Sequence, residues 1–292
     1  MADTRDDETS ETPPQEGGRL KTVLITGCSS GIGREAAKAF LDDDGWRVYA
    51  TARDTDDIAD LGEAGCETAT LDVTDVNQVR QVVERVISET GRVDALVNNA
   101  GYGQMGPIEE VPTEVVHEQF DVNVYGPHRL TRAVLPHMRE RERGTIVNVS
   151  SVVGRVSHPG GGVYAGSKFA LEAMSDALRP EVEPFDIDVA LVEPGPVNTS
   201  FSDNVQSRTE ALERSGAYDW FYSVIEDTQL IGGGGFGSVE AKQVAETILE
   251  AANSPDPNSR YPVGSFGKLS SLARLTPDPI RDALFGVVRR FV

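Results

Sequence analysis

Short runs of apolar residues alternate along the chain with longer segments in which apolar side chains recur every three or four positions. This alternation is typical of a parallel β-sheet that carries helices on both faces. Residues 75–90, with apolar positions at helical spacing, predict one such helix, and residues 31–42 predict another. The predicted strands are residues 23–26, 46–51, 67–73, 93–99, 145–151 and 187–194, with a short seventh strand at 260–264.

The order of these elements predicts an α/β fold, with a Rossmann-like, doubly wound, seven-stranded and mostly parallel sheet. We assign residues 20–268 to this domain, because one domain of this kind can fill most of a 292-residue chain. Residues 1–19 are acidic and lack apolar periodicity, which predicts a disordered tail. Residues 269–292 predict a C-terminal helical extension that docks on its own domain or on a second copy.

Residues 198–237 break this rhythm with a polar start, an aromatic cluster at 218–222 and a glycine-rich stretch at 232–237. An insertion after the sixth strand would lie over the carboxyl edge of the sheet, where doubly wound folds bind ligands. We interpret it as a substrate lid hinged by its glycines. The alternative is a surface excursion whose aromatic side chains pack on the core.

Composition narrows the choice of partners. The chain has 47 acidic against 27 basic residues, a net charge of −20, and such a surface repels both nucleic acid and anionic membranes. The acidic, lysine-poor composition resembles that of proteins from halophilic microbes. Molar salt shortens the Debye length to ~3 Å, so the self-repulsion of such a charged surface would be screened there. Two cysteines predict no disulfide framework, and neither a signal peptide nor a membrane span is evident. We therefore expect a cytoplasmic protein.

The first predicted strand runs into a glycine-rich turn, Thr26-Gly27-Cys28-Ser29-Ser30-Gly31-Ile32-Gly33, and then into a helix. Glycines let the backbone approach a pyrophosphate, and the free N–H groups of the helix start hold the anion. The alternative is a loop with purely structural glycines, against which the strand–turn–helix context argues. The predicted cofactor-binding residues here are Gly27, Ser29, Ser30, Gly31, Ile32 and Gly33.

The second predicted strand ends at Ala52, and Arg53 follows. A site for NAD places a carboxylate near this point to bind the ribose 2′-hydroxyl. Arg53 can instead bind a 2′-phosphate through charge-assisted hydrogen bonds, each worth ~1.5–3 kcal/mol. We therefore predict NADP(H) in preference to NAD(H), although the neighbouring carboxylate of Asp54 is a point in favour of NAD(H).

Tyr164 and Lys168 stand four residues apart at the start of a predicted helix and so share one helix face. A free phenol, with a pKa of ~10, is a poor base, and a nearby ammonium would lower that pKa. Tyr164 is therefore the candidate general acid/base, and Lys168 would also hold the nicotinamide ribose. Ser151, at the end of the fifth strand, would stabilise alkoxide-like charge on the substrate oxygen. Ser150 is its rival, but strand alternation points the two hydroxyls to opposite faces.

These motifs, in this order, resemble those of the short-chain dehydrogenase/reductase family over residues 21 to about 264. The segments VLITGCSSGIG and VYATARD and the long tail look most like its 17β-hydroxysteroid dehydrogenase-like and retinol dehydrogenase-like branch. The resemblance implies that Asp72 and Val73 hold the adenine, although Asp72 or Asp75 could instead cap the next helix. It also implies that Asn123 holds a water that relays protons to Lys168. It further assigns Asn99, Ala100 and Gly101 to the ribose, and Pro194, Gly195, Val197 and Thr199 to the carboxamide.

The sequence thus predicts an NADP(H)-dependent oxidoreductase that interconverts a carbonyl and an alcohol by hydride transfer, without a metal. The branch implies a bulky apolar ketone or alcohol as the small-molecule substrate, and the family implies a homodimer or homotetramer. The alternatives are a 3-oxoacyl-carrier reductase and a non-catalytic NADP(H)-binding sensor; a nucleotide-sugar epimerase fits the glycine spacing less well. We expect His158, between Ser151 and Tyr164, to be a bystander.

Overall fold

A computed structural model of the chain describes residues 19–227, 238–265, 277, 279–280 and 282–283. Seven strands form one sheet in the order β3-β2-β1-β4-β5-β6-β7, and every neighbouring pair is parallel. The predicted α/β fold is confirmed, with a sheet that is parallel throughout and not only for the most part. The strands are β1 (Lys21–Ile25), β2 (Trp46–Ala52), β3 (Glu67–Thr70), β4 (Ala95–Asn98), β5 (Gly144–Val149), β6 (Ile187–Pro194) and β7 (Arg260–Val263).

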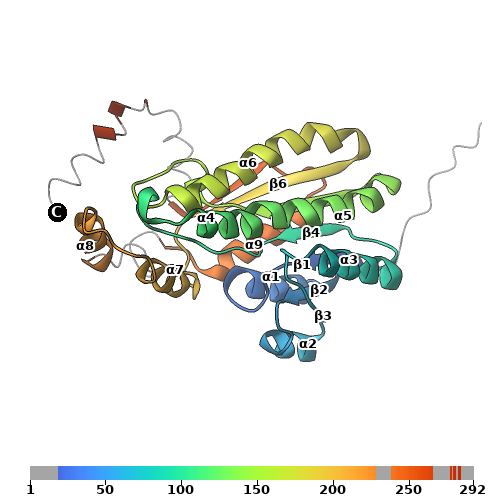
Figure 1. The fold of residues 1–292 in the computed structure, drawn as a ribbon. Coiled ribbons are helices and arrows are strands. Elements are labelled where there is room, and N and C mark those ends of the chain that lie inside the picture. Colours follow the sequence, from blue (N-terminus) through green and yellow to red (C-terminus); the bar gives the residue numbers. More distant parts are fainter. Residues whose placement is uncertain (1–18, 228–237, 266–276, 278, 281, 284–292) are drawn as a thin grey trace, which may run out of the picture.

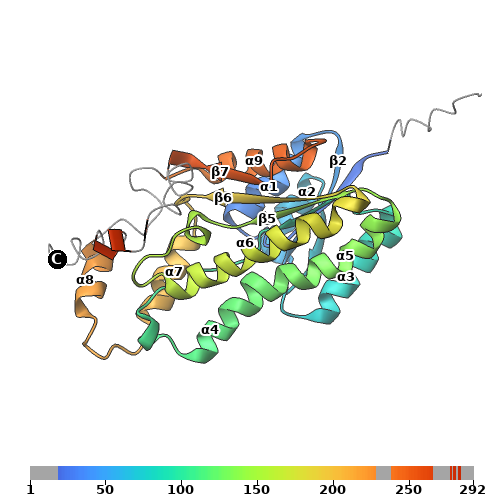
Figure 2. The ribbon, with the colours of Figure 1, turned by 90° about the horizontal axis from the view of Figure 1, so that it is seen from above.

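Helices cover both faces of the sheet (Figures 1 and 2). On one face α1 and α9 pack together, and on the other lie α3, α5 and α6. Each face contributes its own apolar core, because the strands of a parallel sheet are buried on both sides. The helices are α1 (Gly31–Asp42), α2 (Ala59–Ala64), α3 (Val76–Thr90), α4 (Thr113–Phe120), α5 (Gly126–Glu140), α6 (Gly162–Val182), α7 (Phe201–Glu210), α8 (Asp219–Asp227) and α9 (Ala241–Asn253).

The third strand is shorter than its apolar run predicts, because a turn follows it at once. The Asp72 carboxylate accepts hydrogen bonds from the backbone N–H and the hydroxyl of Thr74, at 2.9 and 2.7 Å. Asp75 then caps α3 by accepting from the N–H groups of Asn77 and Gln78. Of the two candidate caps, Asp75 is therefore the one that the structure uses, while Asp72 builds the turn before it.

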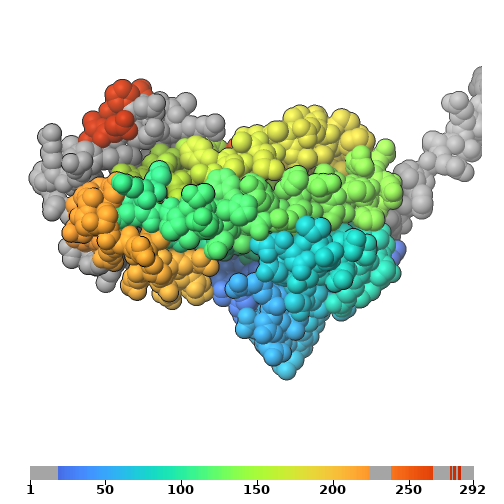
Figure 3. All heavy atoms as spheres, viewed as in Figure 1, coloured from blue at the N-terminus to red at the C-terminus, as the bar shows by residue number. Residues whose placement is uncertain are grey.

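The strand order creates a switch point between β1 and β4, because the chain leaves β1 toward β3 and leaves β4 toward β7. Loops on the two sides of such a point diverge and leave a crevice at the carboxyl ends of the strands. After β6 the chain forms α7 and α8, and Figure 3 shows this segment, in orange, against the green middle part of the chain.

Several predicted segments lie partly or wholly outside the described residues: 1–18 of the acidic tail, 228–237 of the insertion and most of 269–292. The boundaries of 20–268 and the lid and extension assignments therefore stay predictions. Among the described residues, every helix is too short or too polar to cross a membrane.

Candidate active site

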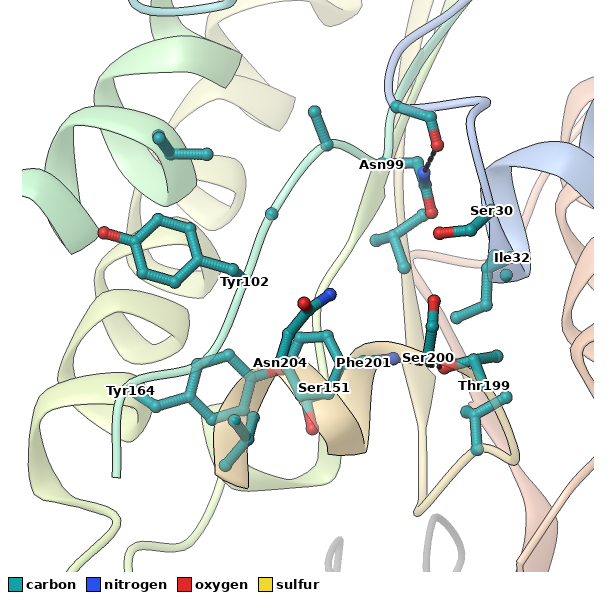
Figure 4. Close-up of a pocket in the computed structure, with 18 of the residues that line it drawn as sticks. Ser30, Ile32, Asn99, Tyr102, Ser151, Tyr164, Thr199, Ser200, Phe201 and Asn204 are labelled. Carbon is teal, nitrogen blue, oxygen red and sulfur yellow. Dashed lines mark hydrogen bonds between the residues drawn. The ribbon is translucent and has the colours of Figure 1, made fainter. Parts of the chain in front are cut away.

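A cavity of about 700 Å³ opens at the carboxyl ends of the strands. Loops that follow β1 to β6 surround it, and α7 forms a further wall (Figure 4). All predicted site residues line this cavity except Gly33 and Asn123. Those that line it are Gly27, Ser29, Ser30, Gly31, Ile32, Arg53, Asp72, Val73, Asn99, Ala100, Gly101, Ser151, Tyr164, Lys168, Pro194, Gly195, Val197 and Thr199.

The turn after β1 forms a cradle at one end of the cavity. Gly27 has φ +72°, and a Cβ there would lie 2.8 Å from Cα of Ala100. The side chain of Ser30, the N-cap of α1, makes no capping hydrogen bond, so N–H groups of the first helical turn are left for a ligand. A backbone cradle in front of a helix N-terminus fits a pyrophosphate.

Gly33 acts behind this cradle and not on its surface. A Cβ at Gly33 would lie 2.2 Å from the carbonyl oxygen of Gly27 and 2.3 Å from Nδ2 of Asn99. The same Asn99 amide donates to the carbonyls of Thr26 and Gly27, at 2.9 and 3.1 Å. Gly33 therefore lets α1 pack directly on the turn, and Asn99 holds the turn to the loop after β4.

Arg53 lies exposed at the cavity after β2. Within the described part of the chain it forms no ion pair, whereas Arg34, on the nearby α1, is paired with Asp60. The Asp54 carboxylate accepts a hydrogen bond from the backbone N–H of Asp56, at 3.0 Å, and so stabilises its own turn. A guanidinium that has no carboxylate partner in the described part of the chain, on the same cavity as the Ser29 and Ser30 hydroxyls, suits a phosphate.

The structure brings Ser151, Tyr164 and Lys168 together at the other end of the cavity. Ser151 follows β5, and the other two share one face of α6. The Lys168 ammonium lies 5.9 Å from the centre of the Tyr164 ring and donates a hydrogen bond to the Val149 carbonyl, at 2.8 Å. Figure 4 shows Tyr164 and Ser151 beside Phe201 of α7, whose ring centre lies 5.6 Å from that of Tyr164.

Burial controls the ionisation of this group. It raises the pKa of Tyr164 to about 12, and the Ser151 hydroxyl counteracts this only in part. It lowers the pKa of Lys168 to about 8, against the opposing charge of Glu172. Loss of solvation therefore dominates the pKa of Tyr164 in the chain alone, and the expected lowering of that pKa by Lys168 stays a prediction.

The neighbouring hydroxyls of Ser150 and Ser151 differ in orientation, as strand alternation predicts. Ser151 faces Tyr164 and donates weakly to the Pro194 carbonyl, at 3.4 Å. Ser150 lies beside Glu172: a Cβ on Gly154 would come within 2.8 Å of the Ser150 hydroxyl and 3.1 Å of Cγ of Glu172. Ser151 is thus the serine that faces the phenol.

Glu172 belongs to a buried charge network behind the cavity. Arg260, from β7, donates to Glu172 at 3.0 Å and to Asp176 at 2.7 Å, and it lies 3.1 Å from Glu193. Arg155 also pairs with Glu193, at 3.1 Å. Burial raises the pKa of Glu172 to about 7, and the Glu193 carboxylate adds to this, against the opposing effects of the Ser150 hydroxyl and Arg260.

Replacing Glu172 with Gln is expected to change the pH dependence of the unfolding free energy. The pKa of Glu172 rises on folding from 4.5 to about 7, so the native state binds more protons between these values. The wild type therefore loses stability as pH rises through this window, by on the order of 3 kcal/mol. The Gln variant lacks this loss, so urea unfolding should show its stability relative to wild type growing with pH. A stability difference that is independent of pH would contradict this account.

Asn123 lies on a π-helical turn (Asp121–Tyr125), behind the cavity wall and buried. Its amide donates to the Tyr102 carbonyl, at 2.9 Å, and to the Ser167 hydroxyl, at 3.1 Å, while its oxygen accepts from the Tyr102 N–H, at 3.1 Å. The side chain therefore positions the Tyr102 loop against α6. Its expected role of holding a water near Lys168 stays a prediction.

Sequence reasoning missed several lining residues. Tyr102, Phe201, Asn204 and Arg208 all line the cavity. The last three stand at i, i+3 and i+7 on α7, a spacing that marks one helix face, but only the fold shows that this face meets the cavity. His158 also lines the cavity, where its Nδ1 lies 3.0 Å from the Pro159 carbonyl oxygen.

The insertion after β6 divides into two parts. Helix α7 lines the cavity, whereas the aromatic residues Phe221 and Tyr222 of α8 are buried. Glu110 holds this second part: it accepts from the hydroxyls of Ser215 and Tyr222, at 2.6 Å each, and these bonds lower its pKa. The aromatic cluster thus anchors the insertion, and α7 is the part that covers the site.

The comparisons with known proteins agree with this geometry. The family model described as short chain dehydrogenase matches residues 21–210. The human 17-beta-hydroxysteroid dehydrogenase type 1 is 38% identical over 255 residues, which cover 82% of this chain and 76% of the relative.

Solved structures extend the similarity to nearly the whole chain. A short-chain dehydrogenase from Streptomyces avermitilis is 35% identical with a TM-score of 0.78, covering 94% of this chain and 99% of that one. The closed form of a serine dehydrogenase, complexed with NADP+, is 27% identical with a TM-score of 0.70, over 83% of this chain and 94% of that one. The chain therefore belongs to the short-chain dehydrogenase/reductase family of oxidoreductases.

Proposed function

We propose that this protein interconverts a carbonyl compound and an alcohol with NADP(H), using Tyr164 as the general acid/base. The observation that carries the proposal is one cavity with Ser151, Tyr164 and Lys168 at one end and a backbone cradle at the other, where Arg53 has no ion-pair partner among the described residues. This arrangement fits a dinucleotide that lies with its pyrophosphate on the start of α1.

The bound dinucleotide would supply or accept the hydride at its nicotinamide ring. In the reducing direction Tyr164 donates its proton to the substrate oxygen, and Ser151 donates a hydrogen bond to the same oxygen. A pKa raised to about 12 keeps Tyr164 protonated and ready to donate. Lys168, with a pKa of about 8, keeps its charge through most of the neutral range and stabilises the phenolate left behind.

Replacing Arg53 with Ala is expected to lower kcat/KM for NADPH at least tenfold and to leave kcat/KM for NADH nearly unchanged. Loss of a charge-assisted hydrogen bond to a phosphate costs ~1.5–3 kcal/mol, and NADH lacks that phosphate. Arg80→Ala, at an exposed arginine on α3, is the matched control. Equal losses with both cofactors would contradict the role of Arg53.

The substrate class that the branch suggests, a bulky apolar ketone or alcohol, has support from the cavity wall. Met105, Tyr164 and Val205 form an apolar cluster, and Val153 and Phe201 pack against it. The similarity to a human 17-beta-hydroxysteroid dehydrogenase points the same way. A 3-oxoacyl-carrier reductase remains the enzymatic alternative, and a non-catalytic sensor the other.

The deciding experiment measures initial rates of NADPH and NADH oxidation in molar KCl, with ketones, aldehydes and a 3-oxoacyl thioester as substrates. Turnover that prefers NADPH would support the proposal. Preference for the thioester would favour the carrier reductase. Tight NADPH binding without turnover of any carbonyl compound would favour the sensor.

A further inference from the structure

One face of α7 carries an aromatic, an aliphatic and a basic side chain in succession along the cavity. Phe201 stands next to Tyr164, and Val205 is buried one turn later. Gly103 makes room for both, because a Cβ there would lie 2.9 Å from each side chain. Arg208 follows at the far end, seven residues after Phe201, or about 10 Å along the helix axis.

The Arg208 guanidinium lies over the Tyr102 ring, 4.0 Å from its centre. This stacking fixes the plane of the guanidinium and leaves its N–H groups open at the edge. Within the described ranges, 19–227 and 238–265, no carboxylate lies within ion-pair distance of Arg208. In a chain with 47 acidic and only 27 basic residues, a cation at a cavity without an acidic partner points to an anion supplied from outside.

The acidic side chains that the structure describes near Tyr102 and Arg208 do not form an ion pair with Arg208. Asp121 pairs with Arg129, at 2.6 Å. Glu110, which lines a second hollow on the other side of Arg208, is bound by Ser215 and Tyr222. Burial raises the pKa of Tyr102 and Arg208 opposes this, while Asp121 and Glu118, which lines the cavity, add smaller contributions that raise it further. Asn204, four residues before Arg208 on α7, lines the same cavity and adds a polar side chain there.

We propose that Arg208 binds a carboxylate on the substrate, so that this enzyme acts on oxo or hydroxy carboxylic acids. The reacting carbonyl lies at Tyr164, the apolar body along Phe201 and Val205, and the carboxylate at Arg208. The substrate class thus combines the apolar middle that the cluster favours with an acid group at the end remote from the reacting carbonyl. This inference rests on the proposed function, because it places the carbonyl at Tyr164.

The test compares ω-oxo alkanoic acids of increasing chain length with their methyl esters, using NADPH. The wild type should prefer the acids by about tenfold in kcat/KM, mainly through KM, with an optimum at intermediate length. The preference should shrink in molar KCl, because screening weakens an exposed ion pair. Arg208→Gln should lower kcat/KM for the acids by about tenfold and so abolish the preference for acids over esters, and Arg208→Lys should restore part of that preference. Arg80→Gln is the control for loss of a positive charge.

Two outcomes separate this inference from the proposed function. If the wild type reduces acids and esters equally and Arg208→Gln changes neither, the carboxylate site is wrong and the oxidoreductase remains. If no carbonyl compound is turned over, calorimetry still measures whether decanoate, a carboxylate without a reacting carbonyl, binds at Arg208 in the presence of NADP+. Binding that Arg208→Gln removes would then support the site and overturn the activity, and equal binding by both proteins would overturn the site as well.

Discussion

Replacing Tyr164 with Phe is expected to lower kcat by about 10²–10⁴-fold, because proton transfer by a positioned side chain contributes about that factor. The ring that packs near Phe201 is retained, so the cavity wall and the fold should not change. NADPH binding, followed by its fluorescence, should stay within about twofold, since Tyr164 contributes its hydroxyl to the reaction and not to the cradle at α1.

The matched control is Tyr125→Phe, which removes a hydroxyl from an exposed tyrosine away from the cavity lining. Its kcat should equal that of the wild type. A Tyr164→Phe enzyme with a kcat close to the wild-type value would show that another group moves the proton. A variant that no longer binds NADPH would instead show that Tyr164 mainly supports the cavity.

Replacing Gly33 with Ala is expected to abolish NADPH binding and to destabilise the fold by about 1–3 kcal/mol or more. The added methyl would lie 2.2 Å from a backbone oxygen of the turn, which cannot move without opening the cradle. Urea unfolding and NADPH fluorescence titration measure the two effects separately.

Gly62→Ala is the control for this change. Gly62 also lies in a helix, α2, but a Cβ there would meet nothing closer than 3.4 Å, at Thr68. An added methyl in that position should raise stability by up to ~1 kcal/mol, because Ala has the higher helix propensity. If Gly33→Ala behaved like Gly62→Ala, close packing of α1 on the turn could not be what the glycine provides.

The parts of the fold that sequence predicts well depend on neighbours along the chain. Helix α1 spans the predicted residues 31–42, and α3 begins one residue after its predicted start, because Asp75 is its cap. The strand after β2 was predicted to run to 73 but ends at Thr70. Leu71 and Val73 are buried like strand residues, and the Leu71 N–H still donates to the Ala52 carbonyl of β2, at 2.7 Å, before the Asp72 turn ends the pairing.

Other properties of the site depend on contacts between distant segments. Asn123 is buried against Tyr102 and Ser167, and no pattern in its own helix predicts this. The pKa of Tyr164 also depends on the solvation that the assembled cavity removes, which no local motif encodes.

Sequence by itself determined the α/β fold, the family and the residues that gather at the cavity, because strand and helix periodicities and short motifs are local. Only the tertiary structure decided which of those side chains face the cavity and what lies opposite them. Gly33 and Asn123 lie behind the cavity wall, and Arg208 stacks on Tyr102, 106 positions away in the chain. The physical reason is that burial and charge at a site are sums over neighbours in space, most of which are remote in sequence.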